Sequence, residues 1–142
     1  MKIDQEEYMP SIIDIEGIGP AYKKKLKAVG VHTTETLLEA GGTPKGRKEL
    51  AEKTGIGDAL ILEWVNLSDL YRVKGVGSEY SDLLEEAGVD TIVELSKRVG
   101  KNLFEKMVEV NEKKKLVRKM PTEAQVTDWV AQAKKLPRKV SY

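Results

Sequence analysis

The sequence predicts an all-α fold made of two tandem copies of one helical unit. No segment alternates apolar and polar residues with the period of two that is typical of β-strands. Glycine and proline fall in short clusters between segments of helical periodicity, which predicts short connections between helices. A shift of 58 residues carries ten positions of the first half onto identical or similar residues in the second half. Such internal similarity indicates repeated structural units.

The first segment has the pattern of two helices joined by a glycine turn. Ile12 and Ile15 suit one face of a short helix. Gly17 and Gly19 then interrupt that helix, because glycine reaches left-handed backbone angles without strain. Pro20 favours the first turn of the next helix, where the missing N–H costs nothing. The spacing therefore predicts a helix, a Gly-Ile-Gly turn and a second helix.

Three more helices are expected before residue 66. One lies between a Thr N-cap and the glycine pair at 41–42, a second runs from Thr43-Pro44 to residue 53, and a third covers residues 59–65. The last of these follows a second glycine turn, Gly55-Ile56-Gly57, with Asp58 in a capping position.

The second half repeats this order. A third glycine turn, Gly75-Val76-Gly77, corresponds to the first, and Thr91 with Glu94 has the spacing of a capping box. Later in the repeat the shift becomes 65 residues, so that Trp64 corresponds to Trp129 as a core residue. The second copy thus gains seven residues, and its last turn, Met120-Pro121-Thr122, lacks both glycines.

We divide the chain at the repeat boundaries. The predicted parts are a lead-in (1–10), a first repeat (11–68), a second and partly degenerate repeat (69–136), and an extended or loose tail (137–142). Each repeat is small for an independent core, so the two are expected to pack as one compact unit.

These patterns resemble a known motif. The order apolar-x-x-apolar-x-Gly-apolar-Gly followed by a helix resembles the helix-hairpin-helix motif. Over nearly its whole length the chain resembles an uncharacterised bacterial family of tandem helix-hairpin-helix proteins, a domain of unknown function. The residues that carry this resemblance are 15–26, 62–66, 74–84 and 128–133. The resemblance implies the fold and, by analogy, DNA binding. In the motif family, the amides of the turn and of the following helix hold a nucleic-acid phosphate, often with a bound monovalent cation.

The first glycine turn is the leading candidate for a phosphate site, because free amides at a helix start attract anions. The residues predicted to bind nucleic acid are Gly17, Ile18, Gly19, Lys23, Lys24, Lys25 and Lys27. The alternative is a structural turn followed by a solvated helix face. Lys23 also departs from the motif, which usually has a small residue there, and its aliphatic stem is expected to lie along the helix crossing.

The other turns are weaker candidates. They supply Gly55 and Gly57 in the first repeat and Lys74, Gly75 and Gly77 in the second. Asp58 competes for the amides of one turn, and the helix after the other carries Glu79, Asp82, Glu85 and Glu86. Capping, structural or protein-facing roles are therefore the main alternatives.

A basic patch lies later in the chain. It consists of Lys113, Lys114, Lys115, Arg118 and Lys119. Residues 97–119 hold nine basic and three acidic residues, whereas residues 1–71 hold 9 Lys and Arg against 12 Asp and Glu. The patch could track a DNA backbone or form a solvated helix face.

The composition limits the other classes of function. The 142-residue chain has a net charge of +1 and no cysteine, which excludes disulfides and Cys-ligated metals. His32 is the only histidine, and no catalytic, metal-binding or nucleotide-binding motif is present, so we expect neither an enzyme nor a small-molecule substrate. No signal peptide or membrane-spanning run is visible, which favours a cytoplasmic location.

Two hypotheses about function remain at this point. The first is a module that binds DNA backbone phosphates without sequence preference. The second is a protein-interaction or self-assembling scaffold, in which the hairpins are structural turns and the charge difference between the halves drives contacts.

Overall fold

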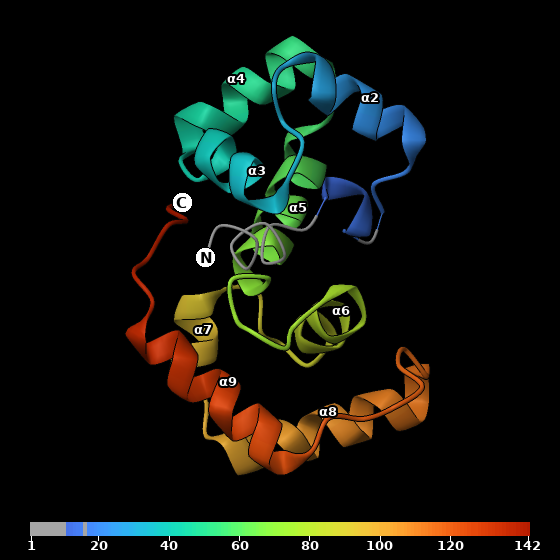
Figure 1. Ribbon diagram of the computed structural model, residues 1–142, viewed down its shortest axis with the longest axis vertical. Helices are drawn as coiled ribbons and strands as arrows, with labels where there is room; N and C mark the ends of the chain where they lie inside the picture. Colours follow the sequence, from blue (N-terminus) through green and yellow to red (C-terminus); the bar gives the residue numbers. More distant parts are fainter. Residues whose placement is uncertain (1–10, 16) are drawn as a thin grey trace, which may run out of the picture. The chain divides into compact units, whose positions relative to one another are not determined.

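The computed structural model describes residues 11–15 and 17–142 (Figure 1). Within these residues the chain forms helices and no β-strand, which confirms the predicted all-α class. The elements are η1 (Ile12–Asp14), α2 (Pro20–Ala28), α3 (Thr34–Gly41), α4 (Pro44–Thr54), α5 (Asp58–Leu70), α6 (Ser78–Glu86), α7 (Ile92–Ser96), α8 (Gly100–Lys114) and α9 (Glu123–Lys135). Each helix in this described part is too short or too polar to cross a bilayer.

The chain divides into two compact units. Unit 1 comprises Met1–Asp69 together with Lys139–Tyr142, and unit 2 comprises Leu70–Arg138. The C-terminal segment therefore returns to the unit with which the chain begins.

Each unit has its own apolar core around one tryptophan. In unit 1, the fully buried side chains include Trp64, Leu26, Leu37 and Ile61. In unit 2, the core contains Trp129 with residues from α6 to α9, among them Leu83, Leu84, Ile92, Leu95, Leu103, Met107 and Val126. Both tryptophans are buried, 1% and 2% exposed, as predicted for core residues.

Threonines begin four of the helices. Thr33, Thr43, Thr91 and Thr122 each accept a hydrogen bond from a backbone N–H in the first turn of α3, α4, α7 and α9. Such N-caps satisfy amides that the helix itself leaves free. α2 and α6 differ, because each follows a glycine, Gly19 or Gly77, that has no side-chain cap.

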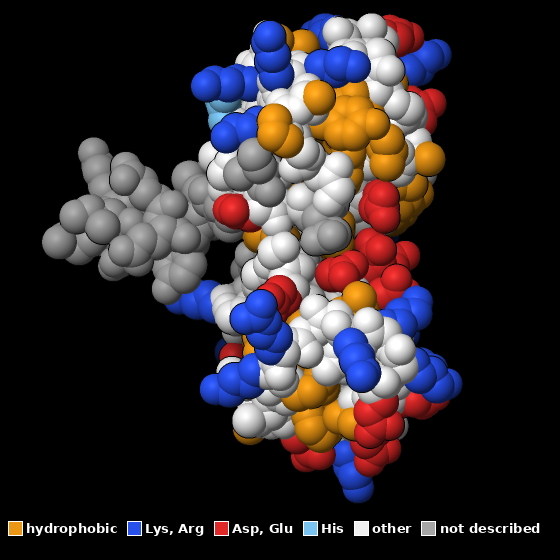
Figure 2. Space-filling view, turned by 90° about the vertical axis from the view of Figure 1, so that its right-hand side faces the viewer, with side chains coloured by type: hydrophobic (Ala, Val, Ile, Leu, Met, Phe, Trp, Pro, Cys, Tyr) orange, Lys and Arg blue, Asp and Glu red, His pale blue; other side chains and the backbone are white. Residues whose placement is uncertain are grey.

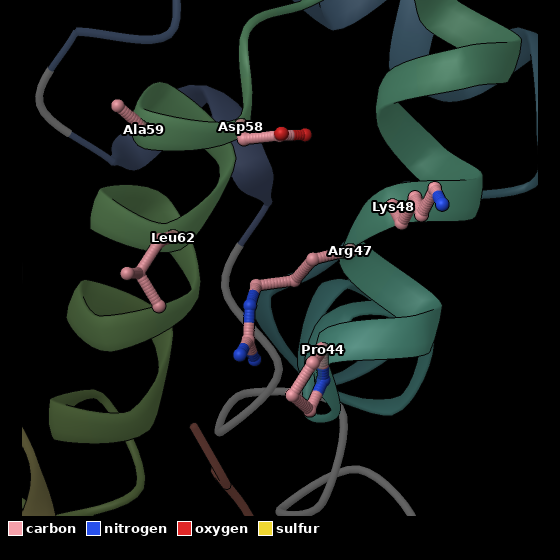
Figure 3. Close-up of a pocket in the computed structure, with 6 residues that line it drawn as sticks. All are labelled: Pro44, Arg47, Lys48, Asp58, Ala59 and Leu62. Carbon is pink, nitrogen blue, oxygen red and sulfur yellow. The ribbon is translucent and has the colours of Figure 1, made fainter.

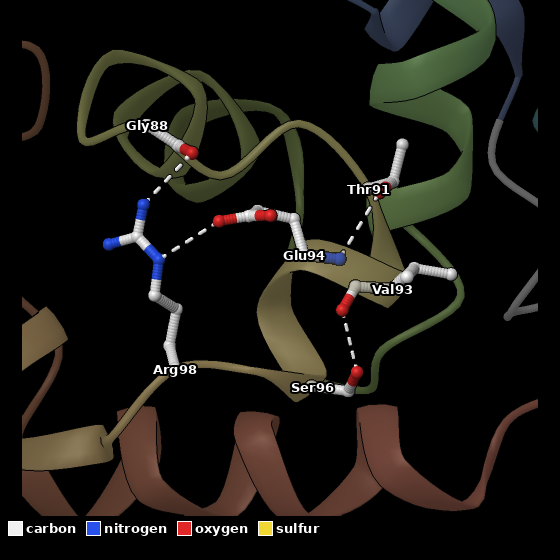
Figure 4. A network of polar contacts seen from close by, with 6 residues as sticks. All are labelled: Gly88, Thr91, Val93, Glu94, Ser96 and Arg98. Carbon is white, nitrogen blue, oxygen red and sulfur yellow. Dashed lines mark hydrogen bonds and ion pairs between the residues drawn. The ribbon is translucent and has the colours of Figure 1, made fainter. Parts of the chain in front are cut away.

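The connection from α6 to α7 is fixed by a polar network (Figure 4). Arg98 donates from Nη2 to the Gly88 carbonyl at 3.0 Å and from Nε to Glu94 Oε1 at 3.2 Å. The backbone N–H of Glu94 donates to Thr91 Oγ1 at 3.3 Å. Thr91 thus starts α7 as its spacing to Glu94 predicts, and the Glu94 carboxylate is paired with Arg98.

α5 is longer than the sequence predicts. We expected a helix over 59–65, whereas α5 begins at Asp58 and ends at Leu70. Ser68 and Asp69 are nearly fully buried within its last turns. Burial against the core overrides the low helix propensity of these polar residues. Because Asp58 is the first residue of α5, Gly57 occupies the position before the helix.

Candidate nucleic-acid interface

The first glycine turn, called the first hairpin from here on, places two glycines around a buried isoleucine. Gly17 has a φ of +94°, in the left-handed region that favours glycine. Ile18 is buried, and its N–H donates to the Ile15 carbonyl at 3.1 Å. Gly19 precedes α2 in an extended conformation, with φ −89° and ψ −176°. The buried Ile18 anchors the turn, while Gly17 is exposed and Gly19 partly exposed.

Lysines follow this turn on α2. Lys24, Lys25 and Lys27 are exposed, whereas Lys23 is half-buried. Figure 2 shows Lys and Arg side chains on the surface of unit 1, in the upper part of the view, beside a group of exposed apolar side chains. The sequence-predicted residues of the first hairpin thus lie on one turn and one helix.

The third glycine turn, called the third hairpin from here on, has the same local geometry 58 residues later in the sequence. Gly75 has a φ of +96°, and the Val76 N–H donates to the Val73 carbonyl at 3.2 Å. Gly77 precedes α6 in an extended conformation. The ring centroids of Tyr80 and Trp129 are 5.3 Å apart. The equivalent pair in unit 1, Tyr22 and Trp64, is separated by 5.1 Å.

The surroundings of the third hairpin differ from those of the first. The amide side chain of Gln132 accepts from the Lys74 N–H at 2.9 Å and donates to the Lys74 carbonyl at 3.2 Å. Gln132 also donates to Asp128 Oδ2 at 2.8 Å. The first turn of α6 carries Glu79. The backbone that approaches this turn is therefore already hydrogen-bonded, and a carboxylate stands at the helix start.

The remaining two turns offer less to an anion. Gly55 ends α4 with a φ of +73°, and Asp58 lies in the first turn of α5. At the fourth turn, Thr122 and Gln125 form a reciprocal capping box at the start of α9. A side-chain oxygen therefore occupies the position that a phosphate would need.

The basic patch lies at the end of α8 and in the segment that follows. Lys113 lies 3.6 Å from Glu109, and Lys114 Nζ donates to Glu86 Oε2 at 2.6 Å. Lys115, Arg118 and Lys119 are exposed. In the lower part of Figure 2, which is unit 2, basic and acidic side chains lie interspersed.

Sequence reasoning missed a functional-looking residue in unit 1, Arg47. It lines a pocket of about 350 Å³ between α4 and α5, with Pro44, Lys48, Asp58, Ala59 and Leu62 (Figure 3). Its guanidinium points away from Asp58, and the residue as a whole is only 8% exposed. Arg47 donates to the Gly41 carbonyl at 2.9 Å and to the Ser141 carbonyl at 2.7 Å. Both partners are backbone carbonyls and Ser141 is 94 positions away in the sequence, so no local pattern indicated this role.

The C-terminal segment packs onto this part of unit 1. Val140 is 3% exposed, and the Ser141 N–H donates to the Gly42 carbonyl at 2.8 Å. The Arg47 guanidinium lies 5.8 Å from the centroid of the Tyr142 ring. Arg47 therefore serves to hold the tail.

The part of the chain that the structure describes contains no group of three or more His, Asp or Glu side chains that could hold a metal ion. His32 is exposed, and its backbone N–H donates to Thr36 Oγ1 at the start of α3.

Comparison with known proteins identifies the family. A family model described as a domain of unknown function (DUF4332) matches residues 16–136. Searches of curated proteins and of solved structures found no match. Because the family model covers most of the sequence, the chain belongs to this family of domains of unknown function.

Proposed function

We propose that the chain is a tandem helix-hairpin-helix protein that binds DNA without sequence preference and without catalysing a reaction. In this proposal the Gly17–Gly19 turn and the start of α2 contact a backbone phosphate.

The observation that carries the proposal is the start of α2. Its N-cap is Gly19, which has no side chain to satisfy the free amides, and Lys23, Lys24, Lys25 and Lys27 follow in the same helix. The amides and the helix dipole both favour an anion at this point. A phosphate would satisfy the amides, and the lysine side chains would neutralise its charge.

The helix-hairpin-helix interpretation is supported by the matching geometry of two turns. Gly17 and Gly75 share a left-handed conformation, and each is followed by a buried apolar residue and a glycine N-cap. Each hairpin also has a tyrosine in contact with the core tryptophan of its unit. Repeated units with one backbone geometry are what a tandem motif produces.

The expected affinity is modest. A hydrogen bond to a charged group contributes about 1.5–3 kcal/mol. Binding that rests on a few phosphate contacts falls in the range of about 10⁻⁴–10⁻⁶ M at physiological salt.

A protein-interaction scaffold is the second candidate. It is favoured by the third hairpin, where the Gln132 side chain is hydrogen-bonded to the Lys74 backbone and the first turn of α6 carries Glu79. In this alternative, unit 2 presents that hairpin to a protein or to a second copy of the chain.

A salt-dependent titration tests the proposal. Fluorescence anisotropy of a short labelled duplex should show binding whose logarithm falls with log salt, at a slope of about −2 to −4 for two to four neutralised phosphates. Reversing the charge of the exposed pair in Lys24→Glu with Lys25→Glu should weaken this binding and make its salt slope shallower. The matched control is Lys45→Glu with Lys48→Glu, an exposed pair on α4 of the same unit. Equal loss in both variants, or no binding at low salt, would contradict the hairpin site.

A further inference from the structure

The segment between α8 and α9 has a fixed backbone, although it contains no helix or strand. Asn111, on α8, accepts from the Val117 N–H at 3.0 Å and donates to the Val117 carbonyl at 3.2 Å. Val117 is 6% exposed, so its apolar side chain is buried while Asn111 holds its backbone. Tyr80 donates from its hydroxyl to the Lys119 carbonyl at 2.9 Å. We call residues 115–121 the basic loop.

The charged side chains of the basic loop remain available. Lys113 and Lys114 directly precede it; Lys113 is paired with Glu109, and Lys114 with Glu86. Lys115, Arg118 and Lys119 are exposed, and the described part of the chain places no carboxylate within 4.0 Å of them. Three cations on an ordered backbone can bind a polyanion at a lower entropic cost than cations on a mobile segment.

The basic loop has no counterpart in unit 1. There, residues 55–57 are all that separates α4 from α5, whereas residues 115–122 separate α8 from α9. Unit 2 has therefore gained this loop where its fourth turn has lost the glycines. Its third hairpin is also unsuited to an anion, because Gln132 binds the Lys74 backbone and Glu79 stands in the first turn of α6.

We propose that the basic loop is the phosphate-contacting surface of unit 2, replacing its glycine hairpins, and that Lys115, Arg118 and Lys119 bind the DNA backbone there. This inference rests on the proposed DNA binding, but it assigns a separate site. Side-chain cations recognise phosphate charge in the basic loop, whereas backbone amides do so at the first hairpin. Such contacts carry no sequence information.

The test removes the three charges without reversing them. In Lys115→Gln with Arg118→Gln and Lys119→Gln, the slope of log affinity against log salt should fall by about 2 to 3, at about 0.9 for each lost phosphate contact. The matched control, Lys97→Gln with Lys101→Gln and Lys134→Gln, removes the same charge from exposed positions of unit 2. Lys101 lies at the opposite end of α8, about 20 Å from Lys115 at a rise of 1.5 Å per residue. The control should keep most of the slope.

The outcomes separate the two proposals. If the loop variant and its control lose equal slope, the basic loop is not a specific contact and the inference is overturned. If the loop variant loses slope while Lys24→Glu with Lys25→Glu binds normally, the hairpin proposal fails and the loop site stands. The reverse pattern overturns the loop site alone. A wild-type protein that binds no duplex at low salt overturns both. Circular dichroism of each variant, unchanged from wild type, confirms that the fold is retained.

Discussion

Gly75 and Trp129 are in such close contact that a Cβ atom on residue 75 would lie 2.9 Å from the indole Nε1. In unit 1 the corresponding separation, between Gly17 and Trp64, is 3.4 Å. Both glycines also have positive φ values. In unit 2, then, the turn and the core tryptophan fit together only because residue 75 has no side chain, whereas in unit 1 it is the left-handed backbone of Gly17 that favours glycine.

Gly75→Ala is therefore expected to destabilise unit 2. The alanine would be strained at a φ of +96° and would displace the Trp129 ring, at a combined cost of about 2–4 kcal/mol. Urea denaturation measures this loss. The control is Gly77→Ala, where the added Cβ meets nothing within 4 Å and φ is −113°. The prediction fails if the two variants are equally stable.

Gly19→Ser should separate stability from binding. Residue 19 has an extended backbone and open space for a Cβ, so the hydroxyl can cap α2. A serine N-cap should leave stability unchanged or raise it by a few tenths of a kcal/mol. Affinity for a DNA duplex should fall several-fold, because the hydroxyl competes with phosphate for the same amides.

Gly77→Ser is the matched variant for that experiment. It makes the same change at the start of α6, where we expect no phosphate. Thermal stability should therefore change as it does in Gly19→Ser, whereas affinity for the DNA duplex should stay at the wild-type value. Unchanged affinity in Gly19→Ser would argue against phosphate binding at the amides of α2.

Arg47→Ala should release the C-terminal segment. The change removes donors to the Gly41 and Ser141 carbonyls and the contact with the Tyr142 ring. Hydrogen bonds from a charged donor contribute about 1.5–3 kcal/mol each, so the loss of these two should cost unit 1 about 3–6 kcal/mol. Hydrogen-exchange mass spectrometry should show faster exchange at Ser141, whose N–H donates to Gly42. The control is Lys48→Ala, at an exposed neighbour of Arg47 on α4. In this variant the Ser141 amide should exchange as slowly as in the wild type.

Asn111→Ala should loosen the basic loop without unfolding α8. The loss of both hydrogen bonds to Val117 should cost about 1–3 kcal/mol and speed amide exchange in residues 115–119. If the basic loop binds DNA, affinity should also fall although every lysine remains. Asn102→Ala, an exposed asparagine of the same helix, is the control. Equal exchange in the two variants would show that Asn111 does not order the loop.

Local patterns predicted much of the fold. The all-α class, the threonine starts of α3 and α7 and the glycine turns depend on nearest neighbours in sequence, and such signals are readable without the structure. The end of α5 was predicted less well, because the sequence indicates the helix only as far as residue 65, whereas α5 continues through the buried residues Ser68 and Asp69 to Leu70.

The parts that could not be predicted depend on contacts distant in sequence. Arg47 reads as one more charged residue of a polar helix, and its role follows from a bond to Ser141 that spans 94 positions. The order of the basic loop likewise depends on Tyr80, 39 positions from Lys119. The charges of the candidate sites were visible in the sequence, whereas the atoms that position those charges were not.

The return of Lys139–Tyr142 to unit 1 has a consequence for the order of folding. During synthesis, the residues that complete unit 1 are made only after all of unit 2. Arg47 and the Gly42 carbonyl therefore find their partner, Ser141, only after unit 2 has been made. Unit 1 can reach its final packing only after residues 139–142 have been made, whereas unit 2 is one continuous segment, Leu70–Arg138. The later half of the chain is thus free to finish folding before the earlier half.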